Sequence, residues 1–191
     1  MSTSTGRPRG PLRHWYLDLA LAFAAVTIAV HVLEAGLPGL LLTRAELRLV
    51  SLLVEASGLH ALAAGYDTLI VYGGRHVVTV VLTPACSGIY AATAFAVSAA
   101  VLPGVGWRQR LSAVAVYAPT VLAANVVRVF AAAAIGAADG PGAMRLFHDY
   151  VGSAFFLVLY AVLWVDWLYR SLGGARHLSI DIEEAVKRLK G

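Results

Sequence analysis

The sequence predicts a mainly α-helical protein: a polytopic membrane helical bundle with one extracytoplasmic β-hairpin, and an amphipathic helix ahead of the span that carries the only cysteine. Hydrophobic residues make up 59% of the 191 residues and charged residues only 14%, whereas soluble domains carry roughly 25% charged residues. Mean hydropathy is +0.74. Several apolar runs are long enough to cross a bilayer, and arginines lie at their ends. This composition excludes an ordinary soluble domain and predicts an integral membrane protein.

The charged residues and the cysteine exclude further classes. The formal charge of +4 and the pI near 9.5 come from arginines at segment ends and from a mixed-charge C-terminal tail. This distribution is typical of membrane topology signals, so we expect no nucleic-acid partner. A single cysteine excludes an internal disulfide and a metal site built from several cysteines. No metal site and no cofactor are predicted.

The chain divides into a cytoplasmic arm (residues 1–14), one membrane domain (residues 15–170) and a cytoplasmic tail (residues 171–191). Basic residues concentrate in the loop that holds Arg108 and Arg110, and again after the last apolar run. Positively charged segments stay in the cytoplasm, so this loop and both termini are expected there. The first apolar run lacks a small-x-small cleavage site and is predicted to remain as a span. The predicted spans are about 15–35, 85–103, 108–135 and 150–170.

Residues 45–64 are predicted to form an amphipathic helix. Its polar positions recur at spacings of four, three, four and three residues, which places them on one stripe: Arg44, Arg48, Ser51, Glu55 and Gly58. A lipid-exposed span would not readily hold Arg48 and Glu55 on one face. We therefore expect this helix to lie on the membrane or against other spans, and a true fifth span is the alternative.

Residues 67–82 are predicted to form a β-hairpin outside the cytoplasm. The runs Thr68–Tyr72 and Arg75–Leu82 are rich in β-branched and aromatic residues, and Gly73 and Gly74 separate them. Two glycines between such runs predict a two-residue hairpin turn. The hairpin would deliver the chain directly to the cysteine.

The hairpin is joined to a long apolar helix by the stretch Thr83-Pro84-Ala85-Cys86-Ser87-Gly88. Thr83 fits a helix N-cap and Pro84 fits the first helical position, so Cys86 is predicted in the first turn. Unpaired amide N–H groups and the positive end of the helix dipole would favour a thiolate there. Small neighbours such as Ser87 and Gly88 would let a substrate backbone approach the sulfur. The alternative is that Cys86 is a small buried hydrophobic residue.

Three polar side chains are expected at one depth in the membrane. Cys86 lies 22 residues before Arg108, which corresponds to roughly 33 Å of helix. Arg128 lies 18 residues after the same loop, or roughly 27 Å, and His148 lies 22 residues before Arg170, again roughly 33 Å. The hydrocarbon core of a bilayer is about 30 Å thick. With the cytoplasmic loop as reference, all three side chains are predicted at or just below the outer membrane face.

Arg128 lies inside the apolar run Tyr117–Ile135. An ionised side chain is costly in such a run and usually faces the protein interior. Asn125 lies three residues earlier, so both side chains project from the same face of the helix. The alternative is an arginine that extends to the outer lipid headgroups.

His148 precedes the last predicted span. A neutral imidazole at this position could act as a base toward the Cys86 thiol, and the neighbouring Asp149 could orient the ring. The alternative is an interfacial histidine with no partner.

The chain resembles the exosortase/archaeosortase family of membrane-embedded cysteine transpeptidases. The resemblance covers roughly residues 40–170 and rests on three features: a strand-rich segment leading into Pro84-Ala85-Cys86-Ser87-Gly88, then Asn125-Val126-Val127-Arg128, then a histidine at the start of the following span. It implies that Cys86 and Arg128 are catalytic, with His148 as the third residue. It also implies that the partners are exported proteins ending in a short motif, a hydrophobic span and a basic tail. These would be cleaved near the outer face of the plasma membrane and passed to an acceptor.

The chemistry of peptide cleavage by a thiol agrees with this set of residues. The reaction needs a nucleophile, a proton acceptor and a group that stabilises the oxyanion, and Cys86, His148 and Arg128 can fill these roles in that order. Arginine suits the third role because it stays charged and offers several donors. Four more residues are expected to bind substrate or support the site: Ser87, Gly88, Asn125 and Asp149.

Three functions remain open from the sequence. The thioester formed on Cys86 could be released by a lipid or another amine, which makes the protein a transpeptidase, or by water, which makes it a protease. The third function is not enzymatic: a membrane binding or transport subunit in which Arg128 holds an anion or a lipid. Only this third function predicts that Cys86 can be replaced without loss. Apart from its substrates, the protein is expected to contact membrane lipids.

Overall fold

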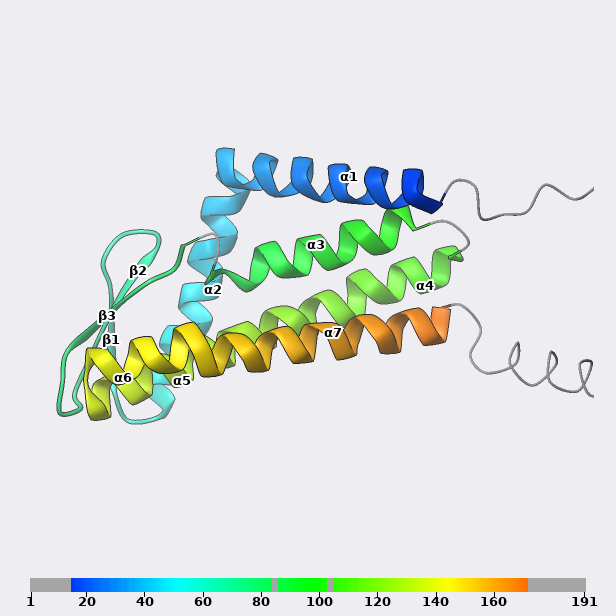
Figure 1. The fold of residues 1–191 in the computed structure, drawn as a ribbon. Helices are drawn as coiled ribbons and strands as arrows, with labels where there is room; N and C mark the ends of the chain where they lie inside the picture. The colour runs from blue at the N-terminus through cyan, green and yellow to red at the C-terminus, as the bar shows by residue number, and fades with distance from the viewer. Residues whose placement is uncertain (1–14, 84–85, 103–104, 172–191) are drawn as a thin grey trace, which may run out of the picture.

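The computed structural model describes residues 15–83, 86–102 and 105–171 of the chain (Figure 1). The predicted arm at residues 1–14, the helical position expected for Pro84 and the predicted tail beyond residue 171 lie outside the described residues. Helices dominate the described part, and a small sheet lies at one end of them.

Four long helical rods form the body of the molecule and run side by side (Figure 1). α3 contacts both α1 and α5, and α5 also contacts α7. The third and fourth rods each contain a short π-helical stretch between two α-helices. The bounds are α1 Trp15–Ala35, α3 Gly88–Val101, α4 Trp107–Ser112 with π-helical Ala113–Tyr117 and α5 Ala118–Asp139, and α6 Pro141–Leu146 with π-helical Phe147–Val151 and α7 Gly152–Ser171.

The arrangement and length of the rods can be compared with the predicted membrane topology. The start of α1, the end of α3, the start of α4 and the end of α7 lie at one end of the molecule, and the sheet lies at the other (Figure 1). Within the described residues, two helices are long and apolar enough to cross a membrane: Trp107–Asp139 and Pro141–Ser171. α3 is apolar but has only 14 residues. A helical membrane protein agrees with these features, whereas the number of spans and the side on which each end lies stay predictions.

The last two rods extend beyond the predicted spans 108–135 and 150–170 at the sheet end. The reason is packing, because Ala133 and Ala137 of α5 belong to the same buried cluster as Val78 of the sheet, and Met144 of α6 packs against that cluster. These rods therefore continue to the sheet instead of ending where the predicted apolar runs end.

α2 (Leu37–Ala56) runs across the bundle at the end that carries the sheet (Figure 1). The prediction of a helix over residues 45–64 is wrong at both ends, since α2 begins earlier and ends at Ala56. It ends in a Schellman motif, in which the Leu59 N–H donates to the Val54 carbonyl at 3.2 Å and Gly58 has a φ of +85°. Gly58 therefore stops the helix, although the sequence prediction counted it as part of the polar stripe.

The chain after α2 forms a three-stranded antiparallel sheet in the order β1 (His60–Ala63), β2 (Thr68–Tyr72), β3 (Val78–Val81). The predicted antiparallel pairing within residues 67–82 is confirmed, since β2 pairs with β3, but the prediction of only two strands is wrong, because β1 pairs with β2 as a third strand.

The predicted two-residue turn is also wrong. Val71 pairs with Val78, so Gly73 and Gly74 lie in a longer loop between β2 and β3. Contacts with α5 explain the longer loop. The His76 N–H donates to the Ala137 carbonyl at 3.0 Å, and a Cβ on Gly74 would lie 2.5 Å from that oxygen. The glycine at this position lets the loop backbone lie directly on the helix.

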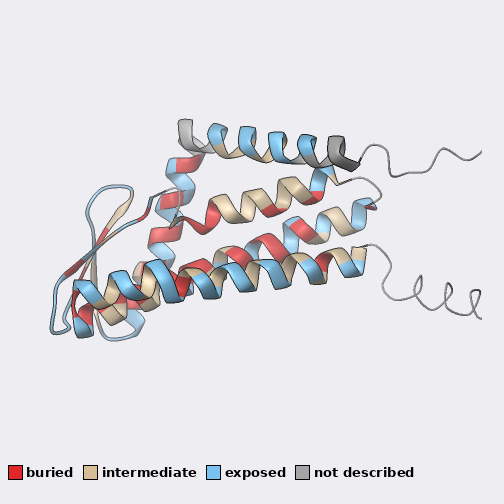
Figure 2. Ribbon diagram, in the orientation of Figure 1, coloured by how far each residue is buried: buried red, intermediate tan, exposed pale blue. Residues whose placement is uncertain are grey.

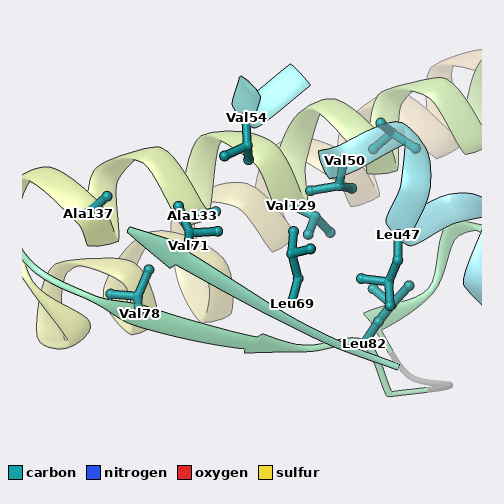
Figure 3. Close-up of a cluster of buried hydrophobic side chains, with 11 residues drawn as sticks. Leu47, Val50, Val54, Leu69, Val71, Val78, Leu82, Val129, Ala133 and Ala137 are labelled. Carbon is teal, nitrogen blue, oxygen red and sulfur yellow. The ribbon is translucent and has the colours of Figure 1, made fainter. Parts of the chain in front are cut away.

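Two clusters of buried apolar side chains meet along α5, where buried residues are frequent (Figure 2). The first cluster joins α2, the sheet and α5, with Leu69 and Val129 among its members (Figure 3). The second joins α3, the π-helical stretch before α5 and α7 around the Phe95 ring, which is stacked on Tyr117 and tilted against Trp164. The polar residues of α5 lie where the two clusters meet.

Candidate active site

Cys86 lies in the connector between β3 and α3. The prediction that it occupies the first turn of the helix, with Thr83 as N-cap, is wrong. α3 begins at Gly88, and Ser87 is its N-cap, whose hydroxyl accepts the Ile89 N–H at 3.3 Å. The Cys86 N–H instead donates to the Thr83 carbonyl at 2.9 Å.

A buried carboxylate, Glu46 of α2, holds this connector. The side chain is only 1% exposed. Its two oxygens accept the Ser87 hydroxyl at 2.6 Å, the Gly88 N–H at 2.9 Å and the Asn125 amide at 2.8 Å. Two of these three donors belong to the residues that directly follow Cys86, so α2 fixes the direction of the backbone beside the sulfur.

Asn125 of α5 completes this clamp from the other side. Its amide group donates to Glu46 and also to the Cys86 carbonyl oxygen, in both cases at 2.8 Å. A Cβ on Gly88 would lie 2.5 Å from the Asn125 Cβ, which explains why the helix begins with a glycine. Ser87, Gly88 and Asn125, which were expected to support the site, therefore all contact one another or Glu46.

Arg128 lies one helical turn beyond Asn125 and faces the protein interior. Its side chain is buried against the Phe156 ring, with the guanidinium carbon 5.2 Å from the ring centroid. Nη2 donates to the Cys86 carbonyl oxygen and Nη1 to the Ser153 hydroxyl, both at 3.4 Å. Within the described residues, its buried Nε has no hydrogen-bond partner.

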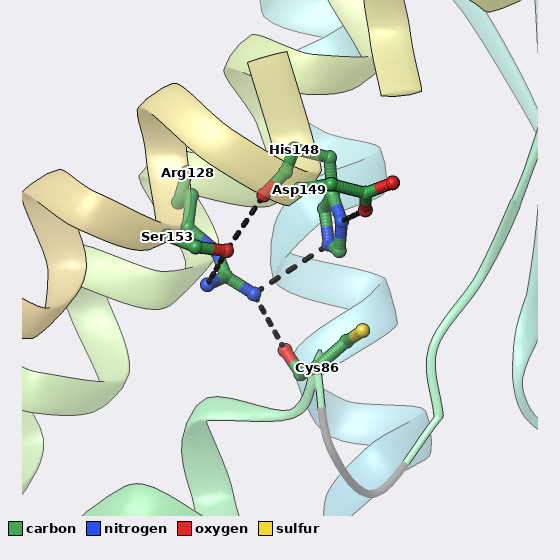
Figure 4. Close-up of polar contacts among 5 residues, drawn as sticks. All are labelled: Cys86, Arg128, His148, Asp149 and Ser153. Atoms are coloured by element: carbon green, nitrogen blue, oxygen red, sulfur yellow. Dashed lines mark hydrogen bonds and ion pairs between the residues drawn. The ribbon is translucent and has the colours of Figure 1, made fainter. Parts of the chain in front are cut away.

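His148 reaches the same place from the π-helical stretch before α7 (Figure 4). Its Nε2 lies 3.5 Å from Arg128 Nη2, and its Nδ1 lies 3.0 Å from a carboxylate oxygen of Asp149. Because the carboxylate can only accept, Nδ1 carries the proton and Nε2 presents a lone pair. The Ser153 hydroxyl donates to the His148 carbonyl oxygen at 2.8 Å and so joins this turn to Arg128.

The surroundings lower the pKa of the Cys86 thiol, which lies in the connector between β3 and α3, outside the helices. The largest cause is the neighbouring His148 side chain, which stabilises the thiolate. Partial burial of the sulfur opposes this and raises the pKa, while the Thr83 side chain and the positive charge of Arg128 lower it further. A thiol with these neighbours is easier to ionise than an isolated one.

The sequence predicted that unpaired backbone N–H groups stabilise the Cys86 thiolate, but three of the amides near the sulfur are already paired. The N–H groups of Cys86, Gly88 and Ile89 donate to Thr83, Glu46 and Ser87, respectively, and none of these three is free to bind an anion. Arg128 therefore supplies the charged donor beside Cys86.

The structure thus brings together Cys86, Arg128 and His148, with Asp149 behind the histidine. Sequence reasoning missed Glu46 and Ser153. The sequence pattern could have identified Glu46, because this residue lies off the polar stripe of α2 and on the face that carries Val50 and Val54. A carboxylate on the apolar face of an amphipathic helix needs buried hydrogen-bond donors. Ser153 has no comparable signal in the sequence.

The fold and this group of side chains define a helical membrane protein with a cysteine, a histidine and an arginine at one site. A family model described as transmembrane exosortase matches residues 6–165, so the chain belongs to this family and the resemblance seen in the sequence is confirmed. No curated protein and no solved structure matches the chain. The exosortases are membrane cysteine transpeptidases, and membership in the family indicates a role in the processing of protein sorting signals.

Proposed function

We propose that this protein is a cysteine transpeptidase of the plasma membrane that cleaves the C-terminal sorting signals of exported proteins near the outer membrane face. One observation carries the proposal: the Arg128 guanidinium contacts both the Cys86 carbonyl oxygen and the His148 ring, and the same His148 side chain lowers the pKa of the Cys86 thiol. This arrangement provides a nucleophile, a base and a fixed positive charge within contact distance of one another.

In the first half of the reaction, the Cys86 thiol gives its proton to His148 Nε2, and the thiolate attacks the carbonyl carbon of the scissile peptide bond. The carbonyl electrons move to the oxygen and form a tetrahedral oxyanion. When this intermediate collapses, the C–N bond breaks and His148 gives its proton to the leaving amine. The exported protein stays on Cys86 as a thioester, and the released fragment keeps the hydrophobic span and the basic tail.

Arg128 stabilises the oxyanion. Its contacts with the Cys86 carbonyl and with His148 are long, at 3.4 and 3.5 Å, and its Nε is unpartnered. Strong charge-assisted hydrogen bonds are shorter, roughly 2.7–2.9 Å. The guanidinium can therefore gain hydrogen bonding as negative charge develops on the substrate oxygen, which lowers the barrier more than it stabilises the ground state.

In the second half of the reaction, an amine attacks the thioester carbonyl. His148 accepts the proton of the attacking amine, the C–S bond breaks and the Cys86 thiolate leaves. The amine belongs to a lipid or to another acceptor, and the product is an amide. Water in place of the amine would give hydrolysis.

Reconstituted protein and a substrate with a short motif, a hydrophobic span and a basic tail test the proposal. Cys86→Ala should still insert into vesicles and should abolish cleavage. Added hydroxylamine should convert the thioester of the unaltered protein to a hydroxamate. Ser98→Ala is the matched control, because the Ser98 hydroxyl bonds only to its own helix at the Ala94 carbonyl. Undiminished processing by Cys86→Ala would refute the enzymatic function and favour a binding subunit.

A further inference from the structure

α2 presents three faces. One face is buried and carries Glu46. A second face is apolar yet exposed, with Leu41, Leu49 and Leu52 at 66%, 46% and 56% exposure. The polar stripe lies between them and includes two exposed arginines, Arg44 and Arg48. A helix that borders an exposed apolar face with a cationic stripe suits the boundary between lipid tails and headgroups.

The arginine stripe opens into a groove between α2 and the β1–β2 part of the sheet, with a volume of about 460 Å³. Arg44 and Arg48 line one wall, and Ala63 and Gly65 line the other. Leu69 also lines the groove, and no carboxylate is among the lining residues. The groove therefore combines an apolar surface with two positive charges.

Within the described residues, neither Arg44 nor Arg48 forms a hydrogen bond or an ion pair. Four residues apart on one helix, their guanidinium groups can lie side by side and bind one phosphate. In the proposed topology both lie at the outer end of the molecule, so the tendency of arginines to stay in the cytoplasm does not account for them.

We propose that this groove binds an anionic phospholipid, with its phosphate on Arg44 and Arg48 and an acyl chain along the exposed leucine face of α2. The charges select an anionic headgroup, and the neighbouring Leu41 and Leu52 favour a ligand that is attached to a chain over a soluble anion. This site is separate from the candidate active site and does not depend on the proposed reaction. Glu46, however, lies on the same helix between the two arginines in sequence, so a lipid bound in the groove would restrain the helix that clamps the Cys86 connector.

Native mass spectrometry of the full chain in mild detergent tests the proposal, with phosphatidylglycerol and phosphatidylcholine of identical acyl chains as probes. The protein should retain one phosphatidylglycerol at concentrations where phosphatidylcholine is lost. Arg44→Gln/Arg48→Gln should weaken this retention by at least about tenfold, because two close phosphate contacts are removed. The matched control is Arg75→Gln/Arg145→Gln, which removes the same charge from two exposed arginines that do not line the groove.

Each other result overturns the proposal. Equal retention of the two lipids would remove the anionic selectivity. An equal loss in the control variant would show that diffuse positive charge is sufficient. Displacement of the lipid by soluble glycerol phosphate at similar concentration would identify a soluble-anion site. If the double variant does not fold, Ala63→Phe provides the second variant, since a large side chain on the opposite wall should displace the lipid while both arginines remain.

Discussion

The connector that carries Cys86 and the helical turn that carries His148 meet at one site, but their surroundings hold them differently. The Cys86 connector is fixed by bonds of 2.6–2.9 Å to Glu46 and Asn125, both of which are 1% exposed. The His148 turn is held by contacts of 2.8–3.5 Å, and the side chain of its neighbour Asp149 is 60% exposed. The comparison suggests a nucleophile fixed in advance and an acid–base group that adjusts as the proton moves.

Arg128→Lys gives the largest expected effect, because Arg128 touches both parts of the site. A lysine keeps the charge but lacks the planar guanidinium fork, so its ammonium cannot reproduce the directions in which Nη1 and Nη2 reach Ser153 and the oxyanion. We expect the rate of substrate cleavage to fall by roughly 10²–10³. Single-turnover cleavage with the substrate in excess over its binding constant measures this. A loss below tenfold would mean that Arg128 does not act on the oxyanion.

Glu46→Gln tests the rigid part of the site. The amide replaces one acceptor oxygen with a donor, so one of the three donors on Glu46 loses its partner. An unsatisfied buried N–H or hydroxyl costs about 1–3 kcal/mol. We expect a lower unfolding temperature together with a cleavage rate reduced by roughly tenfold or more.

Glu55→Gln is the matched control for Glu46→Gln, since Glu55 lies on the same helix and is exposed. It should leave both the unfolding temperature and the cleavage rate unchanged. If Glu46→Gln changed only stability and Glu46→Asp restored nothing, the contacts of Glu46 would be structural and unrelated to the reaction.

The dependence of Cys86 alkylation on pH tests the contact between the two parts. Thiolate is the reacting form, and the lowered pKa of Cys86 means that alkylation should begin at lower pH than for an ordinary exposed cysteine. As the pH falls through this pKa, the rate should be lost. His148→Ala removes the largest stabilising contact of the thiolate, so the midpoint should move to higher pH. An unchanged midpoint would exclude His148 as the group that lowers the pKa of Cys86.

Asp149→Asn gives the smallest expected effect. The amide can still accept a hydrogen bond from Nδ1 of His148, and the exposed position is screened by solvent. We expect the cleavage rate to fall by less than about tenfold, with binding of the substrate unchanged. A loss as large as that of Arg128→Lys would show that the His148 turn is as strictly fixed as the Cys86 connector.

The sequence predicted the parts of the molecule that depend on local pattern. The bounds of α1 follow from one apolar run, and a common depth for Cys86, Arg128 and His148 follows from similar helix lengths measured from the charged ends, whereas their lateral contact comes from the packing of the helices. Helix bounds and depth depend only on residue spacing along the chain, so they can be predicted without knowing which helices are neighbours.

The sequence did not predict the parts that depend on contacts between distant residues. Glu46 bonds to groups 41, 42 and 79 residues away, and nothing within α2 identifies those partners. The loop between β2 and β3 is long because it rests on Ala137, far along the chain. The end of α2 is different, because a local signal for it was present in the sequence. Gly58 is a helix stop signal, but the prediction gave more weight to the polar periodicity, which Gly58 also fits.

The π-helical stretch Phe147–Val151 has a consequence for how the site is encoded. A π-helical turn contains one residue more than an α-helical turn, and each residue of an α-helix turns the chain by about 100°. Deletion of one residue in this stretch would restore a regular helix and rotate His148 by about that angle relative to α7. At the same time α6 is held in place by Met144, which lies against Gly136 of α5. The direction of the imidazole is therefore set by the number of residues in one turn, and a chain one residue shorter here could keep every side chain of the site and still lose the site.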